Sequence, residues 1–216
     1  MKEFSQLQKW KIESLIEKYT KNDNGDFDIK LSKEIAYFDD EKKAYFGLVK
    51  TQKFNIDDKD IYVFDNHNKA IFSVLEQSDK YDRVFDILHI DAHRDDAIFQ
   101  NNYPKEINKK NIQEIFKQSR ISDYLDLMEK TKMIGEISNV TQSWEFENFI
   151  FPKKEFILNL DIDIFGDDGE VVDLELKIMR IIQSWKIAKS VMIATSPGFI
   201  NQENAKFLIE AFLKRI

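Results

Sequence analysis

Three short stretches of the sequence combine residue types that bind divalent metal ions. Two of them, Asp91-Ala92-His93-Arg94-Asp95 and Asp161-Ile162-Asp163, place these residues at every second position. Alternate residues of an extended chain point to the same side, so each stretch can direct its side chains toward one point. His67, which follows an earlier apolar run, could supply a sixth ligand. Each stretch alone could also be a loop that caps a helix or forms salt bridges, and it is their combination that predicts a metal site.

The ligand types indicate what such a site could do. Four carboxylates, from Asp91, Asp95, Asp161 and Asp163, would balance the charge of two divalent ions. Two ions about 3.5 to 4 Å apart can activate a water molecule as hydroxide for attack on an electrophilic carbon. Ligation rich in oxygen with some imidazole suits Mn²⁺, with Zn²⁺, Fe²⁺ and Co²⁺ left open. The chain has no cysteine, which excludes thiolate ligands, disulfides and a cysteine nucleophile.

The elements that must position these side chains can be read from the apolar pattern. Short apolar runs that end in the polar stretches are predicted to be strands, at residues 61–64, 85–90, 155–160 and 191–194. Helical patterns follow them, after residue 70 and at about 111–131, 171–186 and 201–215. This alternation predicts an α/β fold with a mainly parallel sheet, in which a site lies beyond the carboxyl ends of the strands.

The N-terminal part has a different pattern. Apolar residues three and four apart predict an amphipathic helix over residues 5–19, followed by a polar loop. Two short aromatic and aliphatic runs within residues 35–49 predict a hairpin or a pair of edge strands. We expect one domain over residues 1–216, in which residues 1–50 form a helix and hairpin extension.

Composition limits the partners. The formal net charge is −7 and the lysines are scattered, so the chain has no basic stripe for binding nucleic acid. No apolar run approaches the roughly 20 residues that span a bilayer, so we expect no membrane partner. The lack of cysteine fits a reducing, cytoplasmic location. Nothing in the sequence indicates the oligomeric state.

The three metal-binding stretches resemble those of the arginase, agmatinase and histone-deacetylase superfamily. They stand here as Asp65-Asn66-His67, residues 91–95 and residues 161–163, in the family's order. The resemblance covers roughly residues 60 to 200 and implies a compact three-layer α/β/α fold around a parallel sheet, with two Mn²⁺ ions. It also implies that Asp91 and Asp161 bridge both ions and support the attacking hydroxide.

In the same resemblance, His67 and Asp95 complete one metal site, and His93 and Asp163 complete the other. Deacetylases resemble a version with one metal that lacks the carboxylate at the position of Asp95. The presence of Asp95 therefore favours the binuclear branch that hydrolyses guanidino groups.

Within this superfamily the chain is most similar to a small divergent group that includes peptide arginases. The similarity is carried by Asp65-Asn66-His67-Asn68, by residues 88–93 and by Thr195-Ser196-Pro197-Gly198-Phe199. It implies conversion of peptidyl arginine to ornithine with release of urea, in the biosynthesis of modified ribosomal peptides, so an arginine-containing peptide is the expected partner. The alternatives are an agmatinase-like or deacetylase-like hydrolase, and a non-catalytic binding module that retains metal for stability.

Two features depart from the arginase pattern. No histidine follows His93, where arginases have a histidine that shuttles protons. The acid that holds the guanidinium group before a proline is replaced by Ser196. Four other acidic residues could take its place, namely Glu203, Asp96, Asp167 and Asp168. His89 is in phase with Asp91 and should lie beneath the metals, either in the core or supporting the ligands.

Overall fold

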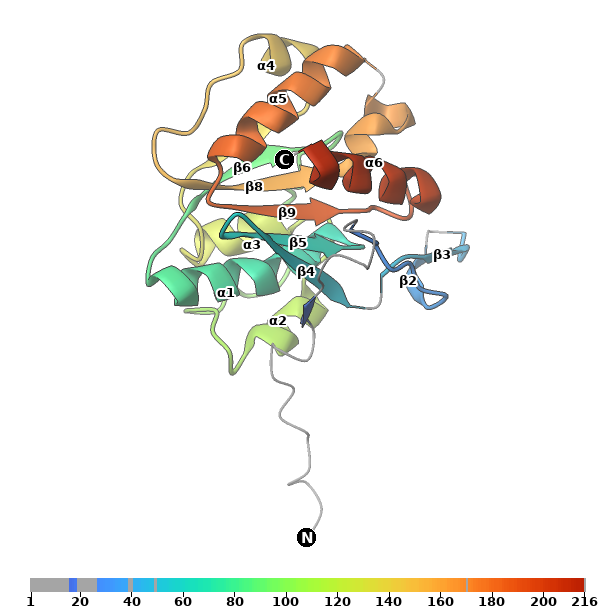
Figure 1. The fold of residues 1–216 in the computed structure, drawn as a ribbon. Coiled ribbons are helices and arrows are strands. Elements are labelled where there is room, and N and C mark those ends of the chain that lie inside the picture. Colours follow the sequence, from blue (N-terminus) through green and yellow to red (C-terminus); the bar gives the residue numbers. More distant parts are fainter. Residues whose placement is uncertain (1–15, 19–26, 39–40, 49, 170, 216) are drawn as a thin grey trace, which may run out of the picture.

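A seven-stranded sheet lies at the centre of the computed structural model, which describes residues 16–18, 27–38, 41–48, 50–169 and 171–215 (Figure 1). In order across the sheet, the strands are β1 (Ile16–Lys18), β4 (Thr51–Ile56), β5 (Lys59–Phe64), β9 (Ser190–Ala194), β8 (Phe156–Asp161), β6 (Asp86–Ile90) and β7 (Ile137–Val140). In this order, each strand from β5 to β7 runs parallel to its neighbour, whereas β4 runs antiparallel to β5 and β1 runs parallel to β4.

Helices cover both faces of this sheet. One face carries α1 (Ala70–Tyr81), α2 (Ile112–Gln118) and α3 (Tyr124–Lys130), and the other carries α4 (Ser143–Glu147), α5 (Leu174–Ile187) and α6 (Gln202–Arg215) (Figure 1). The buried side chains form two clusters, and neighbours in one strand, such as Ile157 and Leu158, belong to different clusters. The predicted α/β fold with a mainly parallel sheet covered on both faces is therefore confirmed.

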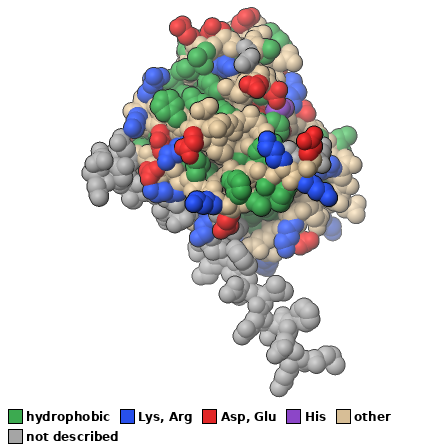
Figure 2. Space-filling model, turned by 90° about the vertical axis from the view of Figure 1, so that its right-hand side faces the viewer, with side chains coloured by type: hydrophobic (Ala, Val, Ile, Leu, Met, Phe, Trp, Pro, Cys, Tyr) green, Lys and Arg blue, Asp and Glu red, His purple; other side chains and the backbone are tan. Residues whose placement is uncertain are grey.

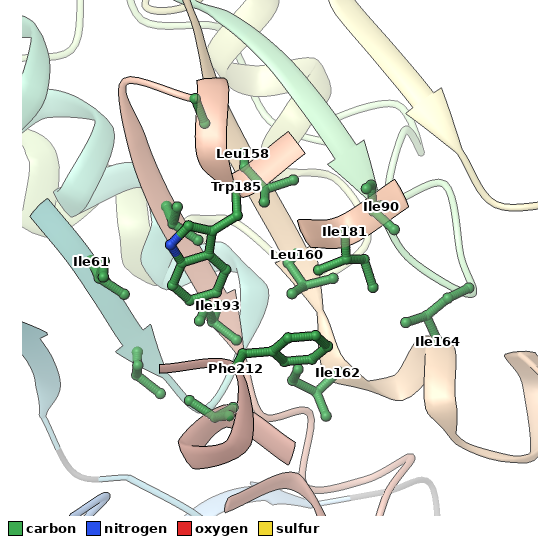
Figure 3. Packing of buried hydrophobic residues seen from close by; sticks show 14 of the residues in the cluster. Ile61, Ile90, Leu158, Leu160, Ile162, Ile164, Ile181, Trp185, Ile193 and Phe212 are labelled. Atoms are coloured by element: carbon green, nitrogen blue, oxygen red, sulfur yellow. The ribbon is translucent and has the colours of Figure 1, made fainter. Parts of the chain in front are cut away.

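The packing of α5 and α6 on β8 and β9 shows how the layers are fixed. The ring of Trp185 in α5 stacks on Phe212 in α6, with ring centroids 6.3 Å apart and planes inclined by 26°. Leu158 and Ile193 of the two strands lie in the same cluster (Figure 3). Aromatic side chains bury large areas and prefer such offset contacts, so this contact packs α5 and α6 together over β8 and β9.

The strand register aligns the residues that follow the strands. Ile90 pairs with Leu160, while Ala194 pairs with both Asp161 and Phe64. The next residues along the chain are therefore collected at one edge of the sheet, as predicted for a parallel sheet.

Two N-terminal predictions have different outcomes. The hairpin is confirmed, because β2 (Ile35–Phe38) and β3 (Ala44–Phe46) form a separate antiparallel pair. The helix predicted over residues 5–19 is wrong at its end, where residues 16–18 form β1 and pair with β4. Residues 5–15 and 19 lie outside the described residues. Pairing with a strand edge outweighs the local helical pattern at this point.

Strand β4 was not predicted from the sequence. It is joined to β5 by the two-residue turn Asp57-Asp58, whose φ angles are 49° and 63°. Positive φ at both positions is typical of the tight hairpin turn that matches the twist of antiparallel strands. The aspartates adopt this conformation more readily than most residues other than glycine.

The helical pattern predicted over residues 111–131 is divided between α2 and α3. Asp123 lies at the break, where its carboxylate accepts a hydrogen bond from the Arg120 backbone N–H at 2.7 Å. The pattern predicted from residue 171 begins as a helix only at Leu174, because Asp173 caps it by accepting from the Leu176 N–H at 2.9 Å. Within the described residues, none of the helices combines the length and apolarity required to cross a bilayer.

Candidate metal centre

The polar residues at the carboxyl ends of four neighbouring strands meet at one edge of the sheet. Asp91 follows β6 and Asp161 ends β8. His67 begins the short 3₁₀ turn η2 (His67–Lys69) after β5, and Ser196 follows β9. All four are buried. The six predicted ligands are brought together here, although they are separated by up to 96 positions in the chain, the span from His67 to Asp163.

His67 is surrounded by carboxylates. Its Nδ1 lies 3.0 Å from Asp91 Oδ2, 3.0 Å from Asp95 Oδ2 and 3.1 Å from Asp161 Oδ2. Asp95 reaches this position because its backbone turns back with φ of 50°. The imidazole is 1% exposed, so this half of the centre is deeply buried.

The loop that carries His67 is held by the N-terminal hairpin. Asn66 Nδ2 donates a hydrogen bond of 2.7 Å to the carbonyl of Ala36 in β2. Lys69 Nζ pairs with Asp65 Oδ1 at 2.6 Å. Gly47, just after β3, lies so close to this loop that a Cβ atom there would be 2.8 Å from the Cβ of Asp65. The hairpin therefore supports one wall of the centre.

His93 forms a second half that is open to solvent. Its Nδ1 lies 3.0 Å from Asp163 Oδ2 and 3.5 Å from Asp91 Oδ1, and its Nε2 lies 3.4 Å from Asp168 Oδ2. The imidazole is 38% exposed. Figure 2, which faces the side toward which β8 and β9 point, shows a histidine at the surface with acidic side chains beside it.

Two groups of side chains in this centre could hold a metal ion, and they share Asp91. One consists of His67, His89, Asp91 and Asp95, and the other of Asp91, His93 and Asp163, with the donor atoms of each group within 4.8 Å of one another. Asp161 belongs to neither group, but its Oδ2 faces His67 and accepts a hydrogen bond from the Ser196 hydroxyl.

Unpartnered atoms in the centre test whether cations fit there. Among the described residues, His67 Nε2, His89 Nε2 and Asp91 Oδ2 are buried without a hydrogen-bond partner. Leaving such a group unsatisfied costs about 1 to 3 kcal/mol. Unpartnered imidazole nitrogens and a carboxylate oxygen beside each other are a donor set that suits a divalent cation. The residues therefore fit a metal ion.

The electrostatics of the carboxylates point the same way. Burial raises the pKa of Asp161 well above its usual value, and the neighbouring charge of Asp163 raises it further. Burial also raises the pKa of Asp163. For Asp91, burial acts in the same direction but is outweighed by the nearby imidazoles of His67, His89 and His93, which lower its pKa. Without cations, these buried carboxylates repel one another.

The imidazoles respond to the same negative charge. The hydrogen bond with Asp163 raises the pKa of His93 to about 11. Burial would lower the pKa of His67, but Asp161 and Asp91 raise it well above its usual value. In the metal-free protein the imidazoles of His67 and His93 are thus held as cations by the carboxylates. A divalent ion would take over that role.

A cleft of about 310 Å³ leads to the centre. His93, Asp161 and Asp163 lie along it, with Asp96, Ser196 and Phe199 among the other lining residues. The ring of Phe199 packs on His93 with centroids 4.9 Å apart. The cleft therefore combines carboxylates with an aromatic surface beside the candidate ligands.

The acidic residues that could replace the missing guanidinium acid lie at different places. Asp96 lines the cleft, and Asp168 contacts His93 from an exposed position. Asp167 is exposed in the 3₁₀ turn η4 (Asp167–Gly169). Glu203 is exposed in the first turn of α6 and is not among the lining residues of the cleft that the structure describes.

Two neighbours of the candidate ligands were not identified from the sequence. Asn159 Nδ2 lies 3.3 Å from His89 Nδ1 and 2.7 Å from Tyr124 Oη, and all three residues are buried. Asn159 precedes Asp161 by two positions, as His89 precedes Asp91. Residues two apart in a strand point to the same side, and this alternation was the signal for Asn159 that the sequence contained. Tyr124 comes from a helix on the covering layer, and the sequence contained no signal for it.

Comparisons with protein-family models, with curated proteins and with solved structures give no match for this chain.

Proposed function

We propose that the protein is a metal-dependent hydrolase of guanidino groups with a binuclear Mn²⁺ centre. Its substrate in this proposal is a peptide whose arginine side chain is converted to ornithine with release of urea. The observation that carries the proposal is that Asp91 belongs to two separate His/Asp groups, since a shared carboxylate is what a pair of neighbouring metal ions requires.

The residues divide the work between the two sites. In this proposal, His67 and Asp95 would hold one ion, His93 and Asp163 would hold the other, and Asp91 and Asp161 would be ligands common to both. Divalent ions at such a centre acidify water and so supply a nucleophile near neutral pH. The hydroxyl of Ser196 orients Asp161, whose Oδ2 accepts its hydrogen bond. The backbone N–H of His93 fixes Asp91 in the same way, at 2.6 Å from its Oδ1.

The cleft supports a cationic, planar substrate. Carboxylates bind guanidinium groups through charge-assisted hydrogen bonds, and an aromatic face attracts cations. Asp96 and Phe199 offer these two contacts on the cleft wall. Because His93 is 38% exposed, a side chain presented by a larger molecule can approach the outer half of the centre. This accessibility supports a peptide substrate.

The direct test measures urea release from an arginine-containing peptide by the Mn²⁺-loaded protein, with mass spectrometry to detect ornithine in the peptide. Free arginine and agmatine are assayed in parallel. Asp91→Asn is expected to reduce urea release to background, whereas Asp79→Asn, the same change at an exposed residue of α1 that does not line the cleft, should leave it unchanged. A fully metallated protein that releases no urea from any of these substrates would refute the proposal.

A second candidate is hydrolysis of another carbon–nitrogen bond, as in an agmatinase-like or deacetylase-like enzyme. The observation that favours it is Ser196, which stands where arginases place the acid that holds the guanidinium group and is already bonded to Asp161. Acetate release from an acetyl-lysine peptide, measured beside urea release from the arginine peptide, distinguishes the two. If the protein binds metal and gains stability but catalyses neither reaction, a non-catalytic module is indicated.

A further inference from the structure

The chain contains three histidines, and all of them lie in this one centre. His89 is the fourth of the five residues of the buried strand β6 and is 0% exposed. Its ring centroid lies 5.3 Å from that of His67, and its Nε2 lies 3.2 Å from Asp91 Oδ2. A polar side chain in such an apolar strand requires compensation.

The atoms that face one another here are not satisfied within the described protein. His89 Nε2 and Asp91 Oδ2 are 3.2 Å apart, yet neither has a hydrogen-bond partner. Both atoms are buried, so water does not replace the missing bond at the surface. A cation between them and the neighbouring ligands would satisfy both atoms.

The other side of the His89 ring is held by Asn159. The Asn159 amide faces His89 Nδ1 at 3.3 Å and Tyr124 Oη at 2.7 Å. An amide can present either its oxygen or its nitrogen to these two partners, because both orientations have the same shape. When the oxygen faces them, His89 Nδ1–H donates to it, and Nε2 keeps a free electron pair. Metal-binding histidines are commonly fixed through their second nitrogen in this way.

We propose that His89 is a further metal ligand, which makes the two metal subsites unequal. The inner subsite contains the imidazoles of His67 and His89 with Asp91 and Asp95. The outer subsite contains one imidazole, that of His93, together with carboxylates. The inference rests on the proposed metal centre but not on any substrate or reaction.

The consequence is ordered loading. The inner ligands are almost entirely buried, with side-chain exposures of 1% for His67, 0% for His89 and 13% for Asp95, whereas His93 is 38% exposed. The inner subsite therefore releases its ion slowly, and its four ligands, against three in the outer group, bind the first ion more tightly. Its two imidazoles also make it more favourable to Zn²⁺ or Co²⁺ than the oxygen-rich outer subsite, which is suited to Mn²⁺.

A titration followed by NMR tests this order, because only three imidazoles have to be distinguished. The protein is labelled with ¹⁵N-histidine, and its signals are assigned with single His→Gln variants. During the first equivalent of Zn²⁺, the ring nitrogens of His67 and His89 should shift together, and His93 should shift during the second. If His89 retains a proton on Nε2 and does not shift through two equivalents, it is not a ligand and the inference is overturned.

A matched pair of variants gives an independent readout. Glutamine at position 89 keeps an N–H donor near Nε2 but has no imidazole electron pair. His89→Gln should weaken the binding of the first Zn²⁺ equivalent by more than the roughly 10- to 100-fold that loss of a supporting contact alone would cause. His93→Gln should weaken the binding of the second Zn²⁺ equivalent and leave the affinity for the first unchanged. Equal affinities in His89→Gln and the wild type would overturn the inference.

Separate measurements test the folding of the variants and the proposed metal centre. Circular dichroism of each metal-free variant shows whether it is folded. If His89→Gln is not, Asn159→Leu replaces it, since loss of the amide frees the His89 ring and should weaken the first equivalent. A protein that binds two ions without any response from His89 refutes only this inference, whereas a protein that binds none refutes the proposed centre as well. Ordered binding without urea release supports the inference and refutes the proposed reaction.

Discussion

Strand β5 connects two buried acidic sites that are compensated in opposite ways. Asp60, near its start, is 4% exposed and pairs with Lys80 Nζ at 2.7 Å and Lys53 Nζ at 3.1 Å. Its oxygens also accept hydrogen bonds from Asn55 and Gln77, both at 3.0 Å. Beyond the other end of β5, the carboxylates around His67 have no lysine or arginine partner among the ion pairs of the described residues.

The pKa directions reflect this contrast. Burial alone would raise the pKa of Asp60, but hydrogen bonds from Lys80, Asn55 and Gln77 outweigh it and hold the pKa below its usual range. At Asp161, burial and the charge of Asp163 together raise the pKa. A buried carboxylate that pairs with lysines of the chain is structural, whereas a carboxylate cluster without lysine or arginine partners can take up an external cation.

The largest predicted effect is stabilisation by metal. Mn²⁺ should stabilise the wild type by about 2.7 kcal/mol for each site at a free concentration about 100 times its Kd, which corresponds to roughly 5 to 10 °C in Tm for a chain of this size. Differential scanning fluorimetry with added Mn²⁺ or a chelator measures the shift. A Tm that neither addition changes would show that the carboxylates around His67 do not need an external cation.

Breaking the compensated site should have a somewhat smaller effect. Asp60→Asn removes the negative charge that Lys53 and Lys80 share, and we expect it to lower the free energy of unfolding by about 1 to 3 kcal/mol. Urea denaturation of the metal-free protein measures this loss. The increment from Mn²⁺ should remain that of the wild type, because Asp60 lies away from the centre. A reduced increment would mean that the two sites are coupled.

The same substitution at the other site should act in the opposite direction. In the metal-free protein, Asp161→Asn removes one of the repelling buried carboxylates, so we expect a gain of roughly 0.5 to 2 kcal/mol in the free energy of unfolding. The variant should at the same time lose much of the stabilisation by Mn²⁺. Denaturation with and without the ion tests both effects, and a loss of stability in the metal-free variant would argue against repulsion at this site.

The smallest predicted effect is a pH dependence. A carboxyl group whose folded pKa is lowered contributes stability above its unfolded pKa of about 4, and this contribution is lost as the pH falls toward the folded value. The stability advantage of the wild type over Asp60→Asn should therefore be full at pH 7 and narrow below about pH 4. Chelator-treated samples isolate this effect from metal binding. An advantage that does not change with acidification would mean that the charge of Asp60 contributes nothing.

Much of the parallel part of the fold could be predicted, because its strands are continuous apolar runs that end in polar residues. No comparable signal marks β4, where polar and apolar residues are mixed and the pairing is fixed by the turn at Asp57-Asp58. Residues 16–18 fit a helical period, yet they pair with β4 through contacts that only the folded chain provides.

The candidate site could be assembled from the sequence where ligands alternate with apolar residues, as at Asp91 and Asp161. His89 follows the same alternation but lies inside an apolar strand, so its pattern favoured a place in the core. Tyr124 could not be predicted at all, because its contact with Asn159 depends on how α3 packs against the sheet. The guanidinium-binding group also remains a prediction, with Asp96 placed in the cleft and Glu203 outside it.

The contact between Gly47 and Asp65 bears on how the chain can be shortened. The hairpin touches the loop of His67 there and through the hydrogen bond from Asn66 to Ala36. Ile29, ahead of the hairpin, donates to Glu210 of α6 at 3.0 Å. A truncated chain that begins at residue 50 would therefore lose a wall of the candidate metal centre and not a dispensable appendage. The minimal unit for engineering this site must include Ile29 and the hairpin.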